Sequence, residues 1–189
     1  MNKFLFLLTF IAITCPVNSQ VVINEYSCAN TTTIADNYGQ FEDWIELYNT
    51  TSSAVNLTGY YLSDKNGNIT KFQIPNGSLP ANGFMKVYCN GRASVTGGNI
   101  HTNFKLTQTK FEKIILSNAS ATIIDSLTII PTQENHSRGR TTNGASTWNL
   151  FTTPTPGVAN TGAKQNYATT PVFSVNAGFY TSTQSVTIT

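Results

Sequence analysis

The stretch Glu42–Asn49, with the sequence EDWIELYN, decides the fold class of this 189-residue chain. Aromatic and β-branched residues dominate it, as is typical of strands, and apolar side chains recur at every second position. This period predicts a strand over residues 44–48 in which Ile45 and Leu47 point toward a core.

Six more segments have a similar composition, and turn sequences such as Asn66-Gly67 and Asn82-Gly83 separate them. They are residues 21–28, 60–63, 71–74, 84–89, 113–117 and 122–128. Short strands at this spacing are typical of an all-β sandwich. No long helix is expected, although residues 36–43 could form a short helical turn. The sequence Thr153–Gly157 breaks the strand pattern, so the folded unit should close before about residue 160.

Alternation within these segments also predicts which side chains form the core. In the segment 84–89, we expect Met85, Val87 and Cys89 to share the buried face. Ile114 and Leu116 should continue that core, together with Ile123 or Ile124.

The composition excludes several functional classes. Aromatic residues make up 11% of the chain and charged residues only 11%, which argues against intrinsic disorder. The net charge is +2 with no densely basic stretch, so we expect no nucleic-acid partner and no capture by anionic lipid. Two histidines, His101 and His136, are too few for a multi-histidine metal site.

The N-terminus has the features of a targeting segment. Lys3 precedes the apolar run Phe4–Ile13, which is about half the length that a membrane-spanning helix needs. Residues 1–19 are therefore predicted to be a secretory signal peptide cut after Ser19. Lipoprotein processing at Cys15 is the weaker alternative, because the residues before it make a poor lipobox. The mature protein is expected to be secreted or at the cell surface, without a transmembrane segment.

Eight short motifs occur in an order that resembles the lamin tail domain family in its secreted bacterial form. They are Ile23–Glu25, Glu42–Asn49, Asn56–Asp64, Phe72–Pro75, Leu79–Gly83, Ile114–Ser117, Ser137–Arg140 and Thr155–Asn160. The resemblance implies an immunoglobulin-like β-sandwich over residues 20–160 that serves as an interaction and anchoring module, with no catalytic residues and no cofactor. The insertion 29–40 and the two cysteines Cys28 and Cys89 depart from the family pattern.

Glu25 and Glu46 lie within predicted strands whose neighbouring residues are apolar. A pair of carboxylates can act as general acid and base, as in glycoside hydrolysis. The alternative is structural: each is hydrogen-bonded to backbone or paired with Arg138 or Arg140. We favour the structural alternative, because the family resemblance implies it and no second catalytic feature accompanies the pair.

The other acidic residues give no convincing metal site. Asp36, Glu42 and Asp43 have the oxygen ligands that calcium takes, but surface charges on a loop are the simpler interpretation. The stretch beginning at Asp64 starts like a calcium loop, yet it lacks the glycine and the bidentate glutamate such a loop requires. We interpret it as a hairpin with Asn66-Gly67 at its tip.

Signal-peptide removal would leave Cys28 and Cys89, which form either one disulfide or two separate buried thiols. Spacing alone does not decide between these alternatives. Tyr60, Tyr61 and Trp148 are candidate aromatics for stacking against a sugar ring, although packing within the sandwich is the favoured interpretation.

The chain is expected to continue past this unit through a polar linker at residues 161–170. Residues 171–189 resemble the opening two strands of the immunoglobulin-like domain at the C-terminus of chitobiase and β-hexosaminidase enzymes. Because two strands cannot bury a core, we expect the natural gene to continue beyond Thr189.

The functional hypothesis is a non-catalytic lamin-tail module of a secreted or cell-surface protein. Its role would be adhesion, anchoring or domain positioning, with a surface polymer or a protein as partner. Two alternatives stay open. One is the accessory N-terminal region of a larger secreted enzyme with a kinase-like module similar to spore coat protein H. The other is a carbohydrate-binding module that uses Tyr60, Tyr61 or Trp148.

Overall fold

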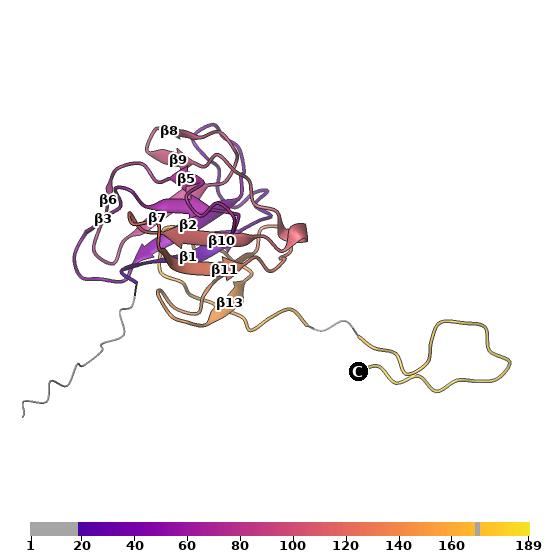
Figure 1. Ribbon diagram of the computed structural model, residues 1–189. Coiled ribbons are helices and arrows are strands. Elements are labelled where there is room, and N and C mark those ends of the chain that lie inside the picture. Colours follow the sequence, from indigo (N-terminus) through magenta and orange to yellow (C-terminus); the bar gives the residue numbers. More distant parts are fainter. Residues whose placement is uncertain (1–18, 169–170) are drawn as a thin grey trace, which may run out of the picture.

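The strand β2 (Trp44–Asn49) lies in the middle of a seven-stranded sheet in the computed structural model, which describes residues 19–168 and 171–189 (Figure 1). The strand order is β13-β12-β1-β2-β7-β9-β8. All neighbours are antiparallel except β7 and β9, which are parallel. The other strands are β1 (Val21–Ser27), β7 (Phe84–Tyr88), β8 (Ser94–Thr96), β9 (Asn99–His101), β12 (Ser137–Arg140) and β13 (Trp148–Phe151).

A smaller sheet forms the second layer, in the order β11-β10-β4-β5. A two-stranded sheet of β3 and β6 accompanies these layers, and a short 3-10 turn, η1 (Gln108–Lys110), precedes β10. The remaining strands are β3 (Val55–Asn56), β4 (Tyr61–Ser63), β5 (Phe72–Gln73), β6 (Ser78–Leu79), β10 (Lys113–Ser117) and β11 (Ile123–Thr128).

A single apolar cluster draws buried side chains from both sheets. Ile45 and Leu47 belong to it, as their alternation predicts, and both are completely buried. The other core predictions are also confirmed, with Met85 only partly buried and Ile124 rather than Ile123 packed against the cluster. The described part of the chain therefore confirms the all-β prediction.

All seven predicted strands are present, and no end of a strand differs from the prediction by more than one residue. The short helical turn expected over residues 36–43 is wrong. Asp36 instead starts a tight turn, in which its Oδ1 accepts hydrogen bonds from the backbone N–H groups of Tyr38 and Gln40 at 2.8 and 3.0 Å. The predicted hairpin around Asn66-Gly67 is confirmed, because β4 and β5 pair antiparallel on either side of it.

The predicted signal peptide, residues 1–19, lies outside the described part of the chain except for Ser19. Within residues 19–168 and 171–189, no helix has the length and hydrophobicity needed to cross a bilayer. Two extended segments near the C-terminus pair through Val172 and Thr189, and Phe173 and Ile188 on them are exposed. Figure 1 shows this part of the chain away from the sandwich.

Candidate functional site

A β-bulge in β1 creates the most polar buried region of the sandwich. The register with β2 runs Ile23↔Leu47 and then Glu25↔Glu46, so Asn24 is an extra residue. Such an insertion lets two consecutive side chains lie on one face, and both Asn24 and Glu25 take polar partners on the side away from the core. The bulge thus places Glu25 directly opposite Glu46.

Thr155–Asn160, here called the closing segment, lies over these carboxylates. Thr155 donates its backbone N–H to Glu25 Oε1 at 3.0 Å and its hydroxyl to Glu25 Oε2 at 2.8 Å. Ser137 of β12 donates its hydroxyl to Oε1 at 2.5 Å. Both oxygens of Glu25 therefore have donors, and no cationic side chain of the described residues forms an ion pair with them.

Glu46 holds the next turn of the closing segment in the same way. Its Oε2 accepts the backbone N–H of Gly157 at 2.5 Å, and its Oε1 accepts Asn24 Nδ2 at 3.0 Å. Glu46 is completely buried, as is Glu25. The two side chains consequently bind the backbone of a segment more than a hundred residues away in sequence.

Three asparagines complete the network at the end of the closing segment. Asn160 donates Nδ2 to the carbonyl of Arg140 at 2.6 Å and accepts Asn24 Nδ2 on Oδ1 at 3.0 Å. Its backbone N–H donates to Asn143 Oδ1 at 2.9 Å. Asn160 thereby joins β1, β12 and the loop after β12.

Burial raises the pKa of both carboxyls above the ordinary value for glutamate. For Glu46 the pKa rises to about 7, because desolvation and the negative charge of Glu25 outweigh the donated hydrogen bonds and the positive charge of Lys86. A raised pKa alone does not make a catalytic acid, which must also reach its substrate. With both side chains covered and their oxygens engaged, the geometry supports the structural alternative.

The Glu46 carboxyl should make the stability depend on pH. With a folded-state pKa of about 7 and an unfolded value of 4.5, folding takes up a proton between these pH values, so stability falls as pH rises through this window. One such group contributes at most about 1.4 kcal/mol per pH unit. We expect the urea midpoint of the wild type to fall from pH 5 to 7 more steeply than that of Glu46→Gln. Equal slopes would contradict this prediction.

The predicted contacts between these carboxylates and Arg138 or Arg140 are not formed and must be corrected. Arg140 donates to Asp125 Oδ2 at 2.7 Å and to the carbonyl of Ile23 at 2.7 Å. Arg138 donates to Asn166 Oδ1 at 2.9 Å. The reason is geometric, since alternation along β12 places both arginines on the face opposite Ser137, which is the residue that contacts Glu25.

The two cysteines are free thiols in the structure, which corresponds to the second of the predicted alternatives. Cys89 is buried in the core, and Cys28 packs against it from the end of β1. Burial raises the pKa of both thiols well above the ordinary value, which keeps them protonated and weakly nucleophilic.

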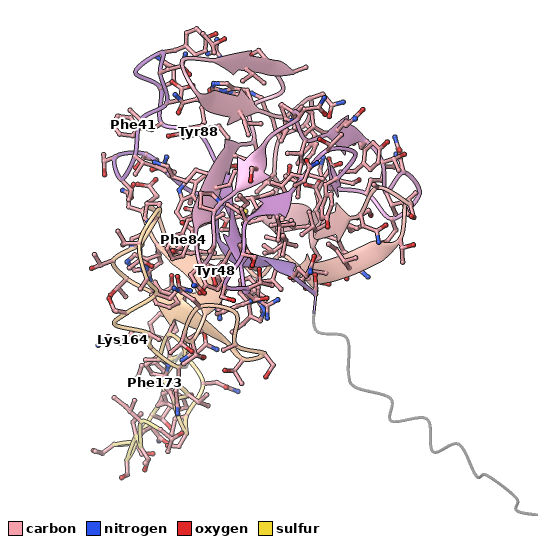
Figure 2. The ribbon with its side chains drawn as sticks, turned by 90° about the vertical axis from the view of Figure 1, so that its left-hand side faces the viewer. Phe41, Tyr48, Phe84, Tyr88, Lys164 and Phe173 are labelled. Carbon is pink, nitrogen blue, oxygen red and sulfur yellow. The ribbon has the colours of Figure 1, made fainter. Side chains whose placement is uncertain are left out.

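The candidate stacking aromatics do not form one exposed platform. Tyr60 and Trp148 are partly buried and pack against the core cluster. Trp148 contacts the Tyr26 ring at a centroid distance of 5.8 Å and lies beneath the Arg140 guanidinium at 5.3 Å. Tyr61 is half-buried on β4 of the other sheet. Figure 2 labels another aromatic pair, the half-buried Tyr48 and Phe84, whose ring centroids are 5.1 Å apart.

Sequence reasoning missed a second buried polar cluster around His101. This completely buried ring contacts Asn90 through Nδ1 at 2.9 Å and Asn37 through Nε2 at 2.8 Å, and it stacks on Tyr88. Asp36 Oδ2 lies 3.8 Å from Nδ1. His101 lies in β9, whereas its partners come from the insertion 29–40 and from the end of β7 with the residues after it. No sequence pattern indicates that these segments meet.

The calcium candidates do not converge. Asp36 faces His101, whereas Glu42 and Asp43 lie just before β2. Among residues 19–168 and 171–189, no three acidic, histidine or cysteine side chains are grouped closely enough to hold a metal ion.

Comparison with known families matches residues 15–131 to the Lamin Tail Domain. The match spans β1 to β11, which is more than half of the chain, and ends before β12 and the closing segment. It gives no support for the chitobiase-type resemblance of residues 171–189, which stays a prediction. Curated proteins yield no match. The chain therefore belongs to the lamin tail domain family, a family of non-enzymatic immunoglobulin-like β-sandwich domains.

Proposed function

We propose that this chain is a non-catalytic positioning and anchoring module of a secreted or cell-surface protein. The observation that carries the proposal is that the chain does not leave the sandwich freely after the closing segment. Residues Lys164–Tyr167, here called the docked segment, remain attached to β12 and β13 although their composition is that of a linker.

The docked segment adds a short antiparallel pairing to the edge of the large sheet. Lys164 and Leu150 exchange backbone hydrogen bonds of 2.8 and 2.9 Å. Two residues further on, Asn166 accepts the hydrogen bond from Arg138. The Tyr167 hydroxyl then accepts the backbone N–H of Gln133 at 2.9 Å and contacts His136 Nδ1 at 2.8 Å.

Together the closing and docked segments hold the chain against the domain from Thr155 to Tyr167. In Figure 2, Lys164 lies between the sandwich and Phe173. A segment held at this many points leaves the domain in a defined direction, so whatever follows it is oriented relative to the sandwich. This is the property that a positioning module needs.

The accessory-region hypothesis is a special case of this proposal, in which the oriented segment belongs to an enzyme. The docked segment would orient an enzyme module and any other downstream partner equally well, so it does not favour the enzyme. Stacking on a sugar has less support, because Trp148 already packs on Tyr26 and Arg140. Secretion stays a prediction, and N-terminal sequencing of protein exported by a secreting host should begin at Gln20.

Replacing Lys164 by proline should release the docked segment, because proline has no N–H to donate to Leu150. We expect thermolysin to cleave residues 161–168 at least tenfold faster than in the wild type, while the unfolding midpoint changes little. Lys164→Ala keeps the backbone donor and serves as the control. Equal cleavage of the proline variant and the wild type would show that the docked segment does not hold the chain, and would overturn the proposal.

A further inference from the structure

A small cavity opens between the edge strand β11 and the β1-β12-β13 side of the large sheet. It has a volume of about 170 Å³ and is here called the Arg138 pocket. Figure 1 labels β11 and β13, which belong to different sheets and both contribute to this cavity. The lining residues are Tyr26, Leu127, Thr128, Ile130, Arg138 and Trp148.

The lining is apolar apart from one charge. Tyr26 is almost completely buried, Leu127 and Trp148 are half-buried, and Ile130 is exposed at the rim. Aromatic and aliphatic walls of this kind take an apolar group. A cavity of about 150 Å³ with such walls accommodates benzene, so the volume suits a single ring or a branched aliphatic chain.

The charge is Arg138, whose relative exposure is only 6%. Its guanidinium is always protonated in proteins. Its Nη2 donates to Asn166, but its buried Nε has no hydrogen-bond acceptor. Within the described residues, the only carboxylates in ion pairs contact Lys71, His101 and Arg140, so none neutralises Arg138. A buried guanidinium without a counter-ion is unfavourable, and an incoming anion would relieve that cost.

We infer that the Arg138 pocket binds a carboxylate attached to one ring-sized apolar group. The apolar group would fill the space between Leu127 and Trp148, and the carboxylate would accept the unused guanidinium N–H. A planar carboxylate matches the guanidinium fork, whereas a sugar would leave most of its hydroxyls without partners against these walls. This inference is independent of the proposed positioning function.

Two sources carry this chemistry, namely a free aromatic acid and the C-terminal residue of a polypeptide. The direct test titrates the full chain with 3-phenylpropionate and with its neutral isostere 3-phenylpropionamide. Trp148 lines the pocket and Trp44 is completely buried elsewhere, so tryptophan fluorescence reports binding and Trp148→Phe should abolish the response. We expect the acid to bind at least tenfold more tightly than the amide.

The variants separate the charge from the cavity. Arg138→Gln should remove the preference for acid over amide, and Leu127→Phe should weaken both ligands at least tenfold while leaving Arg138 in place. The second variant keeps the test decisive if the first fails to fold. Arg92→Gln is the matched control, because Arg92 is exposed and stacks on Tyr38 away from the pocket.

A peptide ending in phenylalanine, with a free or an amidated C-terminus, distinguishes the two sources. Tighter binding of the free peptide than of 3-phenylpropionate would identify a protein C-terminus, and binding of the small acid alone would identify a metabolite-sized ligand. Equal affinity for acid and amide, or no binding of either at millimolar concentrations, would overturn the inference.

Discussion

Replacing Gly139 by valine is expected to destabilise the domain by about 3 kcal/mol or more. A Cβ at this position would lie 2.9 Å from Asn160 Nδ2, 3.0 Å from Phe151 Cε2 and 3.1 Å from Glu25 Cγ. Its backbone needs no special conformation, so the requirement for glycine is entirely one of space. Three groups packed around one missing side chain cannot all move without opening the network beneath the closing segment. Equilibrium urea unfolding measures the loss.

Gly67→Ala is the matched control for this substitution. Gly67 lies at the tip of the hairpin between β4 and β5, and an added Cβ would have no neighbour within 4 Å. We expect a change below about 0.5 kcal/mol there. If Gly139→Val retained wild-type stability, the closing segment would not be packed on β12 as described.

Asn160→Ala should lower the free energy of unfolding by about 3 kcal/mol, which is close to the loss expected for Gly139→Val. The cause here is the loss of buried hydrogen bonds rather than crowding. The side chain is 95% buried, with a relative exposure of 5%, and it bonds the carbonyl of Arg140 and the amide of Asn24. Alanine would leave both groups buried with fewer partners, which costs more than the bonds themselves contribute. Glu46 would also be affected, because Asn24 holds its Oε1.

The control is Asn103→Ala, which removes one exposed hydrogen bond from Asn103 Nδ2 to the carbonyl of Lys71. Its cost should stay below about 1 kcal/mol. Similar losses at Asn160 and Asn103 would mean that the buried amides contribute no more than a surface contact, and would contradict the network described above.

Sequence periodicity was sufficient to predict the central strands, because apolar side chains recur at every second position along them. In residues 44–48 the inward pair Ile45 and Leu47 is as clear in the sequence as in the core. The same holds for β10, whose predicted and observed bounds coincide. The residue types of these strands are therefore enough to indicate which of their side chains are buried.

The strand β12, which escaped prediction, is buried by distant parts of the chain. The strand β12 has the sequence SRGR, which resembles a polar loop, yet all four residues are buried. Its burial depends on β1, β13 and the closing segment, and local sequence contains none of that information.

The candidate site, too, was predictable from the sequence only in part. The prediction that Glu25 and Glu46 are structural rests on their placement in strands and on the family resemblance. Their partners were not predictable, because one extra residue at Asn24 decides which side chains share a face. Because the bulge could not be predicted, the two arginines of the Ser137–Arg140 motif were the expected partners of these carboxylates.

The most direct measurement is hydrogen exchange of the backbone amides that fasten the chain to the sandwich. These amides belong to Thr155, Gly157, Asn160 and Lys164, and they donate to Glu25, Glu46, Asn143 and Leu150 respectively. If the domain positions the chain that follows, these amides should exchange slowly, with protection approaching that of β1 and β2. Exchange at the rate of an unstructured peptide, while β1 and β2 stay protected, would contradict it.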